Sequence, residues 1–148
     1  MTDRPNILYL HSHDTGRYIQ PYGHAVDTPH LKKLASQGIL FRQNFSTAPT
    51  CSPSRAGLLT GMFPHNNGMT GLAHCGWRLN DYHQHILHIL RQSGYTSSLF
   101  GTQHIIDQHQ VHHIGYDLAL PGGSAQERTQ AAFSFLADAP PQPFFVSL

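Results

Sequence analysis

The sequence predicts an α/β fold with a mainly parallel sheet flanked by helices. Short apolar segments of strand length alternate along the chain with amphipathic segments of helix length, an order typical of parallel sheets with crossover helices. Clusters of turn-forming residues separate these segments. The 148 residues contain no internal repeat, low-complexity tract or interdomain linker, and they suffice for one ordinary hydrophobic core.

Local signals place the elements along the chain. Thr28 and Pro29 favour a helix start, Gly38 favours its end, and Gly61 favours the end of the next helix. Residues 102–124 show no regular period and are expected to be irregular. The expected strands cover 6–13, 39–46, 95–101 and 143–148, and the expected helices cover 28–37, 54–60, 82–94 and 125–139.

The composition argues against several classes of partner. The chain has 9 basic and 8 acidic residues, a net charge of +1 with histidine neutral, and no basic run. Binding to nucleic acid or to an anionic membrane surface therefore has no electrostatic support. No segment approaches the about 20 apolar residues of a membrane span, and no signal peptide is visible. We expect a cytoplasmic chain, or a periplasmic or secreted one if a leader has been removed.

Cys51 lies in a setting that suits a reactive thiol. Hydroxyl-bearing residues flank it, Pro53 follows two residues later and Arg55 four residues later. A helix N-terminus and a nearby guanidinium both favour a thiolate, and the same place favours a bound anion. A second interpretation stays open, in which Cys51 is an inert buried cysteine beside a capping serine. Cys75 is expected to be an ordinary thiol, and the spacing does not require a disulfide between the two.

Other polar residues also allow more than one interpretation. Asp14, Cys51 and His104 each follow an expected strand, so we expect them to converge beyond the carboxyl ends of the sheet, where ligands bind. Taken singly, Asp14 also suits an Asx-turn, and His104 a structural loop position. His85 and His88 have a spacing that can bind zinc, but their helix is amphipathic, so we expect a packing or solvated role.

Four segments in order resemble the sulfatase family. CSPSRAGLLTG (51–61) is similar to the signature in which cysteine, proline and arginine direct conversion of the cysteine to formylglycine. GYTSSLFGTQH (94–104) resembles the second signature, and RPNILYLHSHD (4–14) resembles the opening strand and metal loop. TPHLKKLASQGILFRQNF (28–45) is similar to the segment between them, and HNNGMTGL (65–72) resembles the heparan N-sulfatase (sulfamidase) branch and its bacterial relatives. The resemblance implies an alkaline-phosphatase-like fold.

The resemblance also implies a mechanism. Formylglycine made from Cys51 would attack the sulfur as its hydrate, and the second hydroxyl would then allow sulfate to leave. Arg55 and His104 would be the other catalytic residues, with His104 near the leaving group as proton donor or sulfate contact. Thr102 stands where the family usually has a sulfate-binding lysine, which suggests a subfamily with a different sulfate clamp.

One divalent cation, calcium, is implied as the cofactor. Its ligands in this chain would be Asp14, residue 51 and His13, and further family ligands come from beyond residue 148. His13 stands where most members have an aspartate, and imidazole is a poorer calcium ligand than carboxylate. The identity of the metal is therefore open, as is a role for His13 next to the site or against the substrate.

These features predict hydrolysis of a sulfate ester or N-sulfate on a sugar. The implied partners are a sulfated saccharide and a formylglycine-generating maturation enzyme. Because the final run ends inside an expected strand, we expect residues 1–148 to be the N-terminal part of a longer catalytic domain, inactive by itself. The alternatives are a phosphonate or phosphate-ester hydrolase of the same superfamily and a non-catalytic binding protein. Residues 65–74 and the histidines at 109, 112 and 113 are further candidates for substrate contact.

Overall fold

The computed structural model describes residues 4–148. The chain divides into two compact units, each of which is described by itself. The larger unit contains the residues up to Leu10 and the segment Ser46–Leu148, and the smaller unit contains His11–Phe45. None of the described helices is both long enough and apolar enough to cross a membrane.

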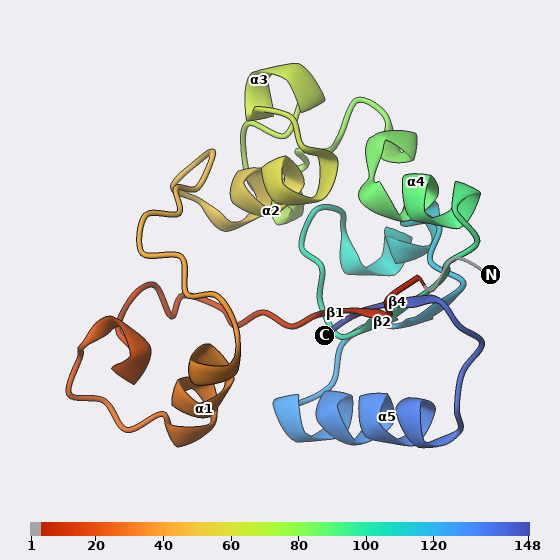
Figure 1. The fold of residues 1–148 in the computed structure, drawn as a ribbon. Coiled ribbons are helices and arrows are strands. Elements are labelled where there is room, and N and C mark those ends of the chain that lie inside the picture. The colour runs from red at the N-terminus through yellow and green to blue at the C-terminus, as the bar shows by residue number, and fades with distance from the viewer. Residues whose placement is uncertain (1–3) are drawn as a thin grey trace. The chain divides into compact units, whose positions relative to one another are not determined.

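The larger unit contains a four-stranded parallel sheet (Figure 1). Its spatial order is β1-β4-β2-β3, and all three pairs of neighbouring strands are parallel. In the register, Ile7 lies opposite Phe145, and Ser98 lies between Val146 and Leu118. The strands are β1 (Ile7–Tyr9), β2 (Thr96–Phe100), β3 (Leu118–Leu120) and β4 (Phe144–Ser147). The predicted mainly parallel sheet is thus confirmed.

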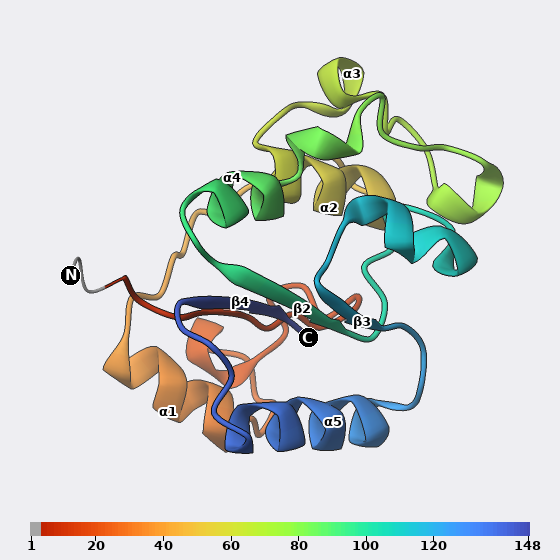
Figure 2. The same ribbon diagram turned by 90° about the vertical axis from the view of Figure 1, so that its right-hand side faces the viewer.

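Helices cover both faces of this sheet (Figure 2). One face carries α2 (Cys51–Thr60), α4 (Ile86–Gln92) and the 3₁₀ helix η4 (Gln108–Ile114), and the other carries α5 (Ala125–Ala137). Leu99 and Phe145 belong to the larger core cluster, whereas Phe100 and Val146 belong to the smaller one. Successive strand residues point to opposite faces, so these apolar runs fill both cores.

Three short helices complete the larger unit: α3 (Pro64–Asn67), η2 (Ala73–Cys75) and η3 (Tyr82–Gln84). The smaller unit contains η1 (Gln20–Tyr22) and α1 (Pro29–Gln37). Pro29 is the first residue of α1, as predicted, but the Thr28 side chain does not cap the helix. Its hydroxyl instead accepts the Gln20 backbone N–H at 3.0 Å. Gly38 ends the helix, as predicted, with an extended backbone.

The expected strand over residues 39–46 is wrong. No strand forms there, and Ile39, Phe41 and Phe45 are 82%, 66% and 86% exposed in the smaller unit. A strand needs a partner for its backbone hydrogen bonds, and among the described residues no segment pairs with this one. Alternation of apolar residues alone therefore did not indicate a sheet face here.

Other boundaries also differ from the predictions. The strand expected over 6–13 is limited to Ile7–Tyr9. α2 begins at Cys51, three residues before the predicted start at Ser54. The predicted helix 82–94 is interrupted at His85, whose extended backbone ends η3 and caps α4. The stretch expected to be irregular contains η4 and β3. The sequence did not predict β3, because a strand of three residues is too short to show a period.

Candidate active site

Cys51 is the first residue of a ten-residue helix. Thr50 precedes it with an extended backbone, and α2 ends at Gly61, whose left-handed backbone donates its N–H to the Gly57 carbonyl. The thiol is half-buried and free, and Cys75 is also free and exposed, so the two form no disulfide. Residue 51 therefore lies at the positive end of the α2 dipole, where negative charge is stabilised.

Close packing fixes the start of α2. A Cβ on Gly57 would lie 2.1 Å from the Thr47 hydroxyl oxygen, so only glycine lets the helix approach the loop before Cys51 this closely. A hydrogen bond of 2.6 Å joins the Ser46 and Ser54 hydroxyls across the same contact. The loop and the helix that carry the cysteine are therefore held as one piece.

His104 lies beside Cys51. The cysteine sulfur and a ring nitrogen of His104 lie within 4.8 Å of each other. His104 follows β2 through a sharp turn, in which Gly101 has a φ of +106° and His104 itself a φ of +65°. A left-handed backbone is uncommon for a residue other than glycine, although histidine adopts it more often than most. The predicted proximity of these two residues is present in the larger unit, although Cys51 does not follow a strand.

A second histidine, His74, lies against this pair. Its exposed ring stacks on that of His104, with centroids 5.6 Å apart and an interplanar angle of 14°. The buried Ser52 hydroxyl accepts the Ala73 N–H at 3.1 Å and so ties η2 to the first turn of α2. From the sequence, His74 was a candidate only as part of the loop 65–74 that could contact substrate, because nothing in the sequence pairs it with His104, 30 positions away.

Arg55 is half-buried one turn beyond Cys51. Burial raises the pKa of the Tyr9 phenol, and the positive charge of Arg55 opposes part of that rise. Tyr9 is the last residue of β1. Thr102, where a lysine was expected, accepts a long hydrogen bond of 3.5 Å from the Arg128 guanidinium.

His13 and Asp14 belong to the smaller unit. The His13 Nδ1 and an Asp14 carboxylate oxygen lie 3.0 Å apart, and their side chains are 56% and 83% exposed. Asp14 has a φ of +53°, which aspartate adopts more readily than most residues. Their predicted approach to residue 51 as metal ligands stays a prediction.

His85 and His88 each use a ring nitrogen in a contact with the protein backbone. His85 is completely buried, and its Nδ1 accepts the Leu87 N–H at 3.1 Å as the N-cap of α4. The Nε2 of His88 lies 3.0 Å from the Ile114 carbonyl oxygen. Burial lowers the pKa of His85 from 6.5 to about 3, and His88 contributes to that lowering. The expectation of a packing role is met by these contacts.

Comparison with known proteins places this arrangement in a family. The family model described as Sulfatase matches residues 5–148. The chain is 38% identical to N-sulphoglucosamine sulphohydrolase of Homo sapiens over 103 residues, which cover 68% of this chain and 20% of the human protein. It is 48% identical to an ulvan-active sulfatase of Formosa agariphila over 69 residues, or 46% of this chain and 12% of that protein. The chain therefore spans only a small part of the length of these relatives.

Solved structures agree with this comparison. BT4656 in complex with its substrate D-glucosamine-2-N,6-O-disulfate superimposes with a TM-score of 0.82 and 25% identity, over 97% of this chain and 33% of that one. A phosphonate monoester hydrolase of Agrobacterium radiobacter shares the fold, with a TM-score of 0.71 and 22% identity over 97% of this chain and 40% of that one. Because the family model covers nearly every residue, the chain belongs to the sulfatase family.

Proposed function

We propose that the complete gene product hydrolyses a sulfate ester or N-sulfate of a sugar, with residue 51 as the nucleophile. The main support for this proposal is the position of Cys51. Its thiol is half-buried, forms no disulfide and lies at the first position of α2, with the sulfur within 4.8 Å of a ring nitrogen of His104. A nucleophile with a proton-transfer group within reach is the basic requirement of such catalysis. An inert buried cysteine would not need either neighbour.

Residue 51 is proposed to act after conversion to formylglycine. The hydrated aldehyde supplies one hydroxyl for attack on sulfur and a second whose deprotonation permits release of sulfate. The N-terminus of α2 and the Arg55 guanidinium stabilise negative charge at this place, as the anionic sulfate requires. The loop 46–50 keeps residue 51 at the helix start through its contact with Gly57.

His104 is proposed to donate a proton to the leaving oxygen or nitrogen of the sugar. Its ring lies beside residue 51, and the stacked ring of His74 restricts its orientation. A sugar alkoxide is a poor leaving group, so protonation at this atom lowers the barrier more than it would for an acidic phenol. His74 is exposed and therefore placed to contact the sugar itself.

Calcium is proposed as the cofactor, but this chain does not supply a complete site for it. Calcium takes about six to eight oxygen ligands, whereas Asp14 and residue 51 together offer very few. The imidazole of His13, which pairs with Asp14, is a poor substitute. In this proposal Asp14 contributes a carboxylate to a set completed by residues beyond this chain.

Amino-sugar sulfates are the proposed substrate class. Besides the human sulphohydrolase, an N-acetylgalactosamine-6-O-sulfatase of Bacteroides thetaiotaomicron is 35% identical over 108 residues, or 70% of this chain and 21% of that protein. The ligand in the BT4656 complex is a glucosamine carrying both kinds of sulfate. A phosphonate monoester is the second candidate, favoured by the shared fold of the Agrobacterium enzyme and by Thr102 in place of a lysine.

Turnover by the complete gene product tests this proposal. The protein is expressed with a formylglycine-generating enzyme and supplied in turn with glucosamine N-sulfate, N-acetylglucosamine 6-sulfate and an aryl phosphonate monoester. Release of sulfate by the wild type but not by Cys51→Ala is the expected result. Faster turnover of the phosphonate would favour the second candidate, and no turnover of any substrate by the matured protein would refute both.

A further inference from the structure

We propose that Gln103 is a positioning residue for His104. Its buried side chain is held by His85 and Tyr116, and this contact keeps the 101–104 turn in the conformation that presents His104 to residue 51. The catalytic importance of this position rests on the proposed function. The clamp itself follows from contacts in the larger unit and can be tested without activity.

The Gln103 side chain is buried, and its amide nitrogen is hydrogen-bonded. It is 1% exposed, and its Nε2 donates to the Tyr116 hydroxyl. Because the Nδ1 of His85 accepts a backbone N–H, the neutral ring carries its proton on Nε2. In the part of the chain that the structure describes, that nitrogen and the Gln103 Oε1 are both buried and neither has a hydrogen-bond partner, although the two side chains interact electrostatically. One of these atoms is a donor and the other an acceptor, so each is the complementary group for the other, and leaving either without a partner would be costly.

A second anchor holds the residue on the other side of His104. The Tyr82 hydroxyl donates to the Ile105 carbonyl at 3.1 Å, and Ile105 is completely buried. Tyr82 begins η3 and His85 follows its end, so one short segment contacts both neighbours of His104. His104 is thus the half-buried residue between two fixed ones.

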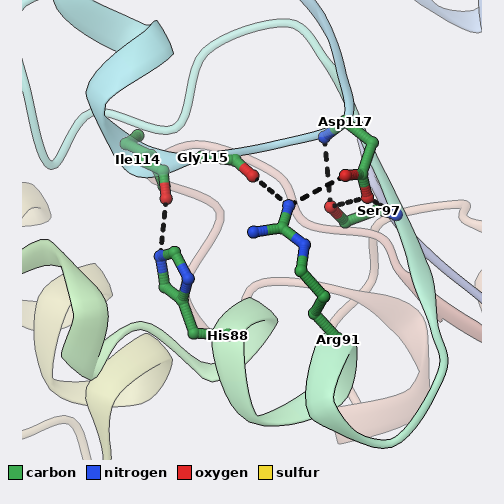
Figure 3. A network of polar contacts seen from close by, with 6 residues as sticks. All are labelled: His88, Arg91, Ser97, Ile114, Gly115 and Asp117. Carbon is green, nitrogen blue, oxygen red and sulfur yellow. Dashed lines mark hydrogen bonds and ion pairs between the residues drawn. The ribbon is translucent and has the colours of Figure 1, made fainter.

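The third member of the clamp, Tyr116, has its own supports. Its ring meets that of His85 edge-on, with centroids 5.7 Å apart and an angle of 72°. A polar network fixes the backbone on both sides of it (Figure 3). In this network Arg91 donates to the Gly115 carbonyl and to Asp117 at 2.9 Å, and Asp117 accepts the Ser97 N–H at 2.7 Å.

These anchors explain the unusual backbone of His104. A histidine with a φ of +65° adopts a conformation that costs free energy relative to the common regions, and fixed neighbours on both sides help to keep it there. Removing one anchor should let the turn relax toward a common conformation. The ring would then leave its place beside residue 51 and against His74, while the substrate-binding residues elsewhere stay in place.

The test compares two clamp variants with a matched control. Gln103→Met removes the buried amide, and Tyr82→Phe removes only one hydroxyl. Tyr95→Phe is the control, since the Tyr95 hydroxyl also donates to a backbone carbonyl, that of Pro5 at 2.8 Å, away from the turn. Each variant is made in the complete gene product, and thermal unfolding confirms that Tyr82→Phe and Tyr95→Phe are folded.

Two readouts are measured on each protein. Turnover is measured with a sugar sulfate and with an aryl sulfate whose phenol is acidic. The rate of carbethoxylation of His104 by diethyl pyrocarbonate is measured by peptide mass spectrometry. In both clamp variants we expect kcat for the sugar sulfate to fall, by up to about 100-fold for Gln103→Met, with little change in KM. The aryl sulfate should lose less, and His104 should be modified faster, whereas Tyr95→Phe should behave as the wild type.

The outcomes separate this inference from the proposed function. If the wild type hydrolyses no sulfate, the proposed function fails, and the modification rate of His104 alone decides whether the clamp exists. If Tyr82→Phe leaves both the modification rate and the ratio of the two turnover rates equal to those of Tyr95→Phe, the inference is overturned. An equal loss on both substrates with a normal modification rate would also contradict it, since that pattern reports a general structural effect.

Discussion

His85 should make the stability of the fold depend on pH in the acidic range. Its side chain is completely buried, and the pKa is lowered from 6.5 to about 3, first by burial and then by the neighbouring His88. Between these two values the unfolded chain binds a proton on His85 and the folded chain does not. The unfolded state is therefore favoured as the pH falls through this range.

The size of this effect follows from the two pKa values. Between pH 7 and pH 5 the wild type should lose about 2 kcal/mol of unfolding free energy through His85 alone. Substitution by asparagine, which can still cap α4, removes the titration but also some packing. His85→Asn should thus be less stable than the wild type at pH 7, and the difference should shrink by about 2 kcal/mol at pH 5.

Urea denaturation at pH 7, 6 and 5 measures this difference. His65→Asn serves as control, because His65 is exposed and its substitution should leave the pH dependence of stability unchanged. A difference between wild type and His85→Asn that is the same at all three values would refute the reasoning. It would mean that His85 is solvated or charged in the folded protein.

Three further substitutions test the packing around the site. Gly57→Ala should lower the free energy of unfolding by about 1–3 kcal/mol despite the better helix propensity of alanine, because its Cβ would overlap Thr47. In a thermal denaturation series, adding Thr47→Ala should restore most of this loss. Ser52→Ala should cost about 1–3 kcal/mol in the same assay by leaving a buried backbone N–H of η2 without its acceptor, and a neutral result would contradict that bond. His74→Ala should raise KM for a sugar sulfate more than for a small aryl sulfate, since its exposed ring stacks on His104 and is proposed to contact the sugar; equal changes in KM would argue against this contact.

The sheet and its helices were predictable because their signals are local. The apolar runs that became β2 and β4 have the length of buried strands, and the start of α5 shows a capping box between Ser124 and Glu127. The strand predicted over residues 39–46 is absent. Alternation of apolar and polar side chains is compatible with a strand, but it does not show that a partner strand is available for backbone hydrogen bonds. The start of α2 at Cys51 was missed because no side chain caps it, so the usual signal is absent.

The candidate site was predictable only in part. Cys51, Arg55 and His104 stand in recognisable motifs, and the structure brings Cys51 and His104 together within one unit. The stacking of His74 and the burial of Gln103 depend on contacts between segments distant in the sequence. Such contacts leave no period or spacing in the sequence, so only the folded structure identifies them.

The central claim is that residue 51 becomes formylglycine in the active protein. The direct measurement is the mass of the tryptic peptide Gln43–Arg55 from the complete gene product expressed with a formylglycine-generating enzyme. The account predicts a peptide that has lost hydrogen sulfide and gained oxygen relative to the unmodified sequence. An intact thiol at residue 51, in the presence of an active maturation enzyme, would contradict the account and separate the motif from its proposed chemistry.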